Sequence, residues 1–344
     1  MTNCMFRILP AVSLISVFFL VSCNNNDAPP DVSAVNVNIR VQRFEADFFS
    51  IRDTLDAARF DELDRRYPGF FRRYVNDILG FAGAAPDTAV KYAGLFASQY
   101  RAYKDSADRL FSDFSPYEKE IRKGLQYVKY YFPRYPLPVN VITYVGPFDG
   151  YGDFIDPADS LLGIGLHLHL GKDFSAYKTT LVQEVYPAYL SARFEPSTIA
   201  VNCMQNIVND MYPEAESDKP LAEQMVEKGK RLYLLSLFLP HTPGHQLIGY
   251  TESQLKDCYR HEALIWNFFV KNNYLQLTDK NTIKNYLGEG PHTRELGEDA
   301  PGNIGSFCGW QMVKKYMREH RDVTPEQLMK TENETIFQAA RYKP

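Results

Sequence analysis

The chain has 344 residues, of which 45% are hydrophobic and 23% are charged, and its 38 basic and 42 acidic side chains give a net charge of −4. The apolar content is too high for a disordered protein, and glycine and proline do not recur as they do in collagen. Since neither sign of charge dominates, we expect no binding to nucleic acid.

The amino terminus has the layout of an export signal. Arg7 precedes an apolar core of about 14 residues, which suits a signal peptide better than a membrane-spanning helix. The core ends in Leu20-Val21-Ser22-Cys23, and a small residue before a cysteine resembles the site at which bacterial lipoproteins are cleaved and lipidated. The sequence predicts a signal peptide over 1–22 and a lipid on Cys23; the alternative is an ordinary secretory signal with a chance cysteine.

The residues that follow predict a tether and a single domain. Residues 23–38 begin with a polar, proline-containing tract that cannot build a core, so we expect a lipidated, flexible segment. Several acyl chains on one cysteine would hold the protein firmly at a bilayer. Residues 39–344 show no repeat and no linker, which predicts one domain. Together with the predicted lipid on Cys23, this places the domain in the cell envelope, facing the periplasm.

The first third of this domain is helical and rich in aromatic residues. From about 42 to 131, apolar side chains recur in steps of three and four, which places them on one face of each helix.

Two β-rich runs follow, at Val139–Val145 and Ser160–Leu170, separated by a loop rich in glycine, aspartate and tyrosine. Later helices are predicted over 198–211, 221–239, 251–270, 304–317 and 323–328, the third with a capping box of Thr251 and Gln254. The predicted fold class is α+β, mainly helical with a small sheet.

The order of strand, helix and later helix resembles the core of zinc peptidases with an HExxH motif. If Glu184 stands for the catalytic glutamate, Gln183 and Pro187 occupy the positions of the two histidines, and Glu227 is the candidate third ligand. An amide oxygen is a weak ligand, and proline offers none and disturbs the helix. We therefore predict a degenerate peptidase-like cleft without metal, cofactor or catalysis.

Other candidate sites are weaker. His167 and His169, two apart on a predicted strand, share one face, where they would clamp a metal or, as we favour, lie on the solvent side of an edge strand. Asp153, Asp156 and Asp159 lack the glycine spacing of a calcium loop.

Small residues and thiols leave further alternatives open. The segment 301–309 could cradle an anion at a helix start, but we favour close helix packing by its glycines. Cys203, Cys258 and Cys308 are predicted to be buried thiols, with one disulfide as the alternative.

Several short sequence segments, taken in order along the chain, resemble one family, the gliding-motility lipoprotein GldB and its relatives in Bacteroidetes-type bacteria. They are Tyr130–Pro133, Leu161–Asp173, Leu221–Lys230, Tyr250–Glu252, Glu262–Trp266, Pro301–Gly305, Gly309–Gln311 and Arg341–Pro344. Members usually carry an acidic residue before Leu170-Gly171, where this chain has His167-Leu168-His169.

The resemblance implies an envelope protein whose partners belong to the gliding machinery or its associated secretion apparatus. Two other hypotheses remain. One is a hydrolase with an unrecognised site around Glu184, Glu227 and His167. The other is a periplasmic lipoprotein that binds a glycan or peptide through the Tyr144–Tyr151 loop.

Overall fold

The computed structural model describes residues 28–50, 56–214 and 218–344. The predicted signal peptide, Cys23 and the first residues of the tether lie outside the described residues. Residues Asp31–Pro344 form one compact unit. Across the described ranges, each helix is too short or too polar to cross a bilayer.

The domain begins earlier than the sequence predicts. Val32 and Val37, assigned to the flexible tether, are buried in the core. The backbone of this segment is also held: Gln126 Nε2 donates to the Val35 carbonyl at 2.9 Å and Arg122 Nη1 to the Val37 carbonyl at 2.8 Å. The composition of residues 31–38 predicted a tether, but two buried valines and two backbone hydrogen bonds hold the segment on the domain.

The sheet has four strands, in the order β1-β2-β4-β3. Strands β1, β2 and β4 are parallel, and β3 is antiparallel to β4. Their bounds are β1 (Arg40–Arg43), β2 (Asn140–Tyr144), β3 (Phe154–Asp156) and β4 (Leu161–Gly165). The structure confirms the α+β class and the strand at 139–145, whereas β1 was missed because Arg-Val-Gln-Arg carries no strand pattern.

The prediction for Ser160–Leu170 was wrong in two respects. Strand β4 lies inside the sheet instead of at its edge, and it ends at Gly165, where a 3₁₀ turn over Leu166–Leu168 follows. Glycine at 163 is required because a Cβ there would lie 2.3 Å from the Phe154 ring. Because the chain forms a 3₁₀ turn after Gly165, the alternation of apolar residues beyond Gly165 does not belong to a strand.

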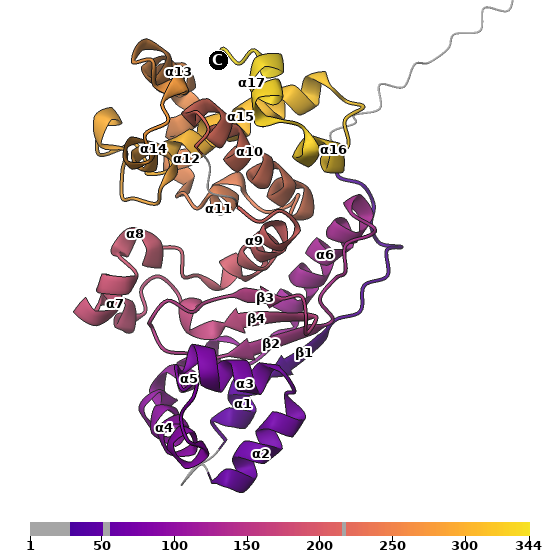
Figure 1. Cartoon of the computed structure of the whole chain (residues 1–344), viewed down its shortest axis with the longest axis vertical. Helices are drawn as coiled ribbons and strands as arrows, with labels where there is room; N and C mark the ends of the chain where they lie inside the picture. The colour runs from indigo at the N-terminus through magenta and orange to yellow at the C-terminus, as the bar shows by residue number, and fades with distance from the viewer. Residues whose placement is uncertain (1–27, 51–55, 215–217) are drawn as a thin grey trace, which may run out of the picture. The chain divides into compact units, whose positions relative to one another are not determined.

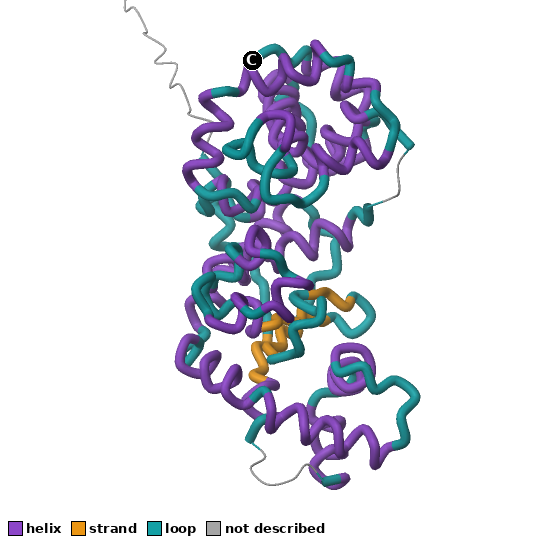
Figure 2. Tube along the Cα trace, turned by 90° about the vertical axis from the view of Figure 1, so that its left-hand side faces the viewer, coloured by secondary structure: helices purple, strands orange, loops and turns teal. Residues whose placement is uncertain are grey.

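Helices cover both faces of the sheet (Figure 1). Those before β2 confirm the predicted helical region: α1 (Phe44–Phe48), α2 (Ala57–Arg66), α3 (Phe70–Arg73), α4 (Pro86–Gln99), α5 (Arg101–Leu110) and α6 (Ser115–Tyr131). Helix α1 packs on β2, whereas α9 (Ile199–Met211) packs on β3 and β4 from the opposite side. Figure 2 shows the strands enclosed between these helices.

The rest of the described chain is helical. Its elements are α7 (Thr180–Val185), α8 (Ala188–Ser191), α10 (Leu221–Phe238), α11 (Gly244–Ile248), α12 (Glu252–Arg260), α13 (Glu262–Lys271), α14 (Lys280–Leu287), α15 (Ile304–Glu319), α16 (Pro325–Lys330) and α17 (Asn333–Ala340). The capping box of Thr251 and Gln254 is confirmed. The helix predicted over 251–270 is instead two helices that meet at His261.

Helices α10 and α15 cross at very short range. A Cβ on Gly309 would lie 1.7 Å from the Met225 carbonyl oxygen, and a Cβ on Gly229 would lie 2.2 Å from the Gly309 oxygen. The structure thus confirms that the glycines after Pro301 serve close helix packing.

Candidate functional site

A cavity of about 840 Å³ lies beside helix α9. Most of the residues that line it fall within 150–153, 186–209, 228–235, 245–252 and 287–306. The cavity therefore has one wall from the loop before β3 and the α8–α9 region, and another from helices α10 and α11 and the segments after α14.

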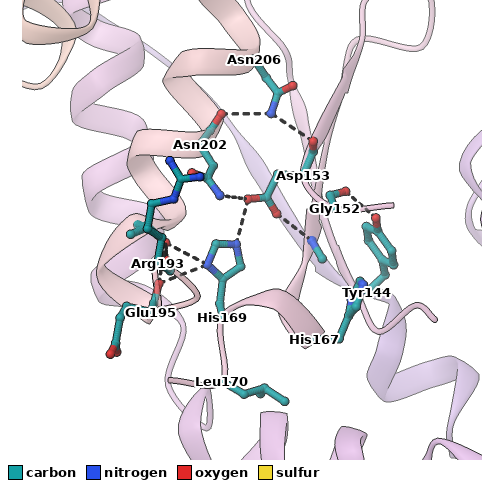
Figure 3. A network of polar contacts seen from close by, with 12 residues as sticks. Tyr144, Gly152, Asp153, His167, His169, Leu170, Arg193, Glu195, Asn202 and Asn206 are labelled. Atoms are coloured by element: carbon teal, nitrogen blue, oxygen red, sulfur yellow. Dashed lines mark hydrogen bonds and ion pairs between the residues drawn. The ribbon is translucent and has the colours of Figure 1, made fainter. Parts of the chain in front are cut away.

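A buried carboxylate lies at the base of this cavity. The Asp153 side chain is 2% exposed, and its Oδ2 lies 2.8 Å from His169 Nε2 (Figure 3). It also accepts hydrogen bonds from Asn202 Nδ2 and the Gly165 amide, each at 2.9 Å. Burial by itself raises the pKa of this carboxyl, but the His169 charge and these hydrogen bonds offset burial and bring the pKa below 3.8.

His169 is held at both ring nitrogens. Nε2 faces the Asp153 carboxylate, whereas Nδ1 lies 3.2 Å from the Glu195 carbonyl oxygen and 3.3 Å from the Thr198 hydroxyl. A protonated ring can donate from Nε2 to the carboxylate and from Nδ1 to the Glu195 carbonyl. Burial lowers the pKa of His169, whereas the Asp153 carboxylate raises it, and the net pKa lies above 6.5. This buried ion pair joins the loop before β3 to the turn that follows β4.

The neighbouring His167 is neutral, although it is equally buried. Its Nδ1 accepts from the Gly146 amide at 3.1 Å, so the proton is on Nε2, which donates to the Tyr151 carbonyl at 3.0 Å. Burial lowers the pKa of His167 to about 4. The prediction that both histidines lie on the solvent side of an edge strand was therefore wrong.

The low pKa of His167 makes stability depend on pH. Between pH 6.5 and about 4 the unfolded chain binds a proton at this histidine and the folded protein does not, so stability falls as the pH falls. We expect the loss to reach on the order of 3 kcal/mol near pH 4. Urea denaturation over this pH range, compared between wild type and His167→Gln, measures it.

The variant should show a shallower fall in unfolding free energy across the same range. The exposed His241→Gln is the matched control and should keep the wild-type slope. Equal slopes for wild type and His167→Gln would contradict a neutral, buried His167.

The structure separates the residues of the predicted peptidase-like cleft. Helix α7 ends at Val185, and Pro187 is the N-cap residue of α8, so Gln183 and Pro187 are not one turn apart on a single helix. The Gln183 amide donates to the Tyr177 carbonyl, and the Glu184 side chain is exposed. Pro187 ended the helix outright, where the sequence suggested a kink.

Glu227 lies on α10 in an ion-pair network. Its carboxylate is 3.1 Å from Arg231 Nη2 and 3.7 Å from Lys230 Nζ. Within ranges 28–50, 56–214 and 218–344, no hydrogen bond or ion pair joins it to Glu184 or His167. Nor do three or more His, Cys, Asp or Glu side chains among these residues gather in a way that could hold a metal ion.

The remaining predicted groups are also dispersed. Asp156 pairs with Arg73 at 2.9 Å, while Asp153 pairs with His169, so the three aspartates do not form a common site. Tyr144 of the predicted binding loop is fully buried, with its hydroxyl donating to the Gly152 carbonyl at 2.6 Å. The three cysteines that follow Cys23 are buried and free.

The Asp153–His169–Asn202 cluster was not predicted as a unit. Its members come from a loop, a turn after β4 and a helix, and the sequence separations of 16 and 49 residues follow no periodicity. One signal was present: Asn202 and Asn206 recur at helical spacing on a helix that was correctly predicted.

Comparison with models of protein families identifies a match. The model of the family described as gliding motility protein GldB matches residues 25–344. No curated protein and no solved structure matches the chain. Since the match covers nearly all of the sequence, this chain belongs to the GldB family of gliding motility proteins.

Proposed function

We propose that this protein is a lipid-anchored, periplasm-facing component of the gliding machinery or of the secretion apparatus associated with it. Its role in this proposal is to bind, and the cleft beside α9 is where it does so. The family match over residues 25–344 is the observation that carries the link to motility.

The absence of catalysis is part of the proposal and is supported by the chemistry of the side chains. The Gln183 amide is engaged by the Tyr177 carbonyl, and Glu227 is neutralised by Arg231. His167 uses both ring nitrogens in hydrogen bonds to the backbone. A general base needs a free lone pair or carboxylate near the substrate, and among these candidates only the exposed Glu184 retains one.

Complementation of a deletion strain of the source organism tests two parts of the proposal separately: the lipid anchor on Cys23 and the absence of catalysis at Glu184. Cys23→Ala should leave the protein outside the membrane fraction and should fail to restore colony spreading, since acyl chains provide the membrane affinity. Cys4→Ala is the matched control, because it changes a cysteine within the predicted signal peptide. Glu184→Gln should restore spreading fully.

Two results would contradict the proposal. Retention of the Cys23→Ala protein in the membrane fraction would contradict anchoring through a lipid on Cys23. Loss of spreading with a stable, folded Glu184→Gln protein would favour the hydrolase hypothesis.

A further inference from the structure

One face of α9 presents a row of side-chain amides to the cavity. Asn202, Gln205, Asn206 and Asn209 stand at i, i+3, i+4 and i+7 of this helix, so they share a face. All four line the cavity. They are neutral groups that both donate and accept hydrogen bonds.

The surroundings fix the orientation of three of these amides. Asn202 must turn Nδ2 toward the Asp153 carboxylate, which only accepts. Asn206 uses Nδ2 for two carbonyl oxygens, those of Asp153 at 3.1 Å and Asn202 at 3.0 Å (Figure 3). Asn209 must turn Oδ1 toward the Arg231 guanidinium, which only donates, at 3.1 Å.

These contacts leave a defined set of unused groups. With respect to residues 28–50, 56–214 and 218–344, Asn202 and Asn206 retain their Oδ1 as acceptors, and Asn209 retains its Nδ2 as a donor. The Gln205 amide makes no hydrogen bond within the described part of the chain, and its side chain is exposed. Asn202, Asn206 and Asn209 therefore offer two acceptors and one donor on side chains that folding has already ordered, and Gln205 adds an amide that can adjust to a ligand.

Two ion pairs lie among the charged groups that line the cavity. Arg193 on one wall pairs with Glu289 on the other at 3.0 Å. Lys228 pairs with Glu214 at 2.7 Å. A neutral polar ligand would leave both ion pairs intact.

The lining also contains apolar and aromatic side chains. Tyr186 and Phe194 both line the cavity, and their rings meet edge to face with centroids 5.1 Å apart. Aromatic rings beside neutral hydrogen-bonding groups suit a ligand with C–H faces and many hydroxyls. None of the strand residues that the structure describes lines the cavity, so an extended peptide would find no sheet edge to pair with.

We infer that the α9 face of this cavity binds a neutral oligosaccharide. Each sugar hydroxyl both donates and accepts a hydrogen bond, and so matches the mixed row of amides. This inference rests on the proposed binding role of the cleft and names its ligand class.

The test is binding by the full chain, purified in a detergent without a sugar head group. Saturation-transfer NMR and calorimetry would screen chitotetraose, cellohexaose, maltohexaose and mannohexaose, with a neutral hexapeptide of serine and glycine alongside. We expect at least one oligosaccharide to bind, and the double variant Gln205→Ala/Asn209→Ala to weaken that binding at least tenfold.

Gln338→Ala supplies the matched control, because Gln338 is an exposed glutamine on α17 outside this cavity. It should bind like wild type. The inference is overturned if none of the four sugars binds at millimolar concentration, if only the peptide binds, or if the double variant binds sugar as well as wild type. Those results would leave the motility experiments on Cys23 and Glu184 unaffected, so failure of the ligand class is distinct from failure of the proposed function.

Discussion

Replacing Gly309 with alanine should destabilise the protein by at least about 3 kcal/mol, and we expect most of the variant to be recovered unfolded or aggregated. The added Cβ would lie 1.7 Å from the Met225 carbonyl oxygen, which belongs to the backbone of α10 and cannot rotate away. The two helices would have to separate, and the buried side chains along both would lose their packing. Urea denaturation followed by the fluorescence of the buried Trp310 measures the change.

Gly290→Ala is the control for the loss of a glycine. The nearest atom to a Cβ there is the His292 carbonyl oxygen at 3.8 Å, an ordinary contact. That variant should stay within about 1 kcal/mol of wild type. A Gly309→Ala protein as stable as Gly290→Ala would show that α10 and α15 are not in close contact.

His169→Ala should destabilise the protein by about 3–5 kcal/mol, because it leaves the Asp153 carboxylate buried without its cation. The pair is almost inaccessible to solvent, with side chains 0% and 2% exposed. Since the pKa of His169 is raised in the folded protein, its contribution is complete below pH 6.5 and is lost as the pH rises through the folded value. Urea denaturation at pH 6 is therefore the appropriate measurement.

A second variant separates the ion pair from simple packing. Asp153→Asn/His169→Gln removes both charges, so it should be less destabilised than the sum of its single variants. Lys178→Ala removes an exposed ion pair with Asp173 and should change stability by less than about 1 kcal/mol. Additive single effects at 153 and 169 would contradict a coupled ion pair.

Many of the helices could be predicted because apolar spacing, capping residues and prolines mark a helix within its own sequence. The bounds of α9 and α10 follow from apolar spacing and from the prolines at 213 and 240, and the start of α12 follows from the capping box. The family could also be predicted, since it rests on phrases along the sequence. The prediction missed helix boundaries that carry no local signal, such as the one at His261, where α12 and α13 meet.

The candidate site could not be predicted in the same way. The proposed alignment with a peptidase placed Gln183 and Pro187 on one helix, but α7 ends at Val185 and Pro187 lies between α7 and α8. The alternation over Ser160–Leu170 predicted one strand, yet the chain turns after Gly165, and His167 forms hydrogen bonds to backbone groups of another loop, a contact that alternation cannot predict.

The sequence by itself determined the family, the helical majority, the close packing of α15 and the residues available for chemistry. Only the tertiary structure decided which of the chemically active residues lie in contact. Strand β1 pairs with a strand about a hundred residues later. Asp153 meets His169 and Asn202 in a buried environment, where their contacts lower the pKa of Asp153 and raise that of His169. Helix capping and spacing depend on neighbours within one or two turns, whereas burial and pKa depend on groups that packing brings together from distant segments.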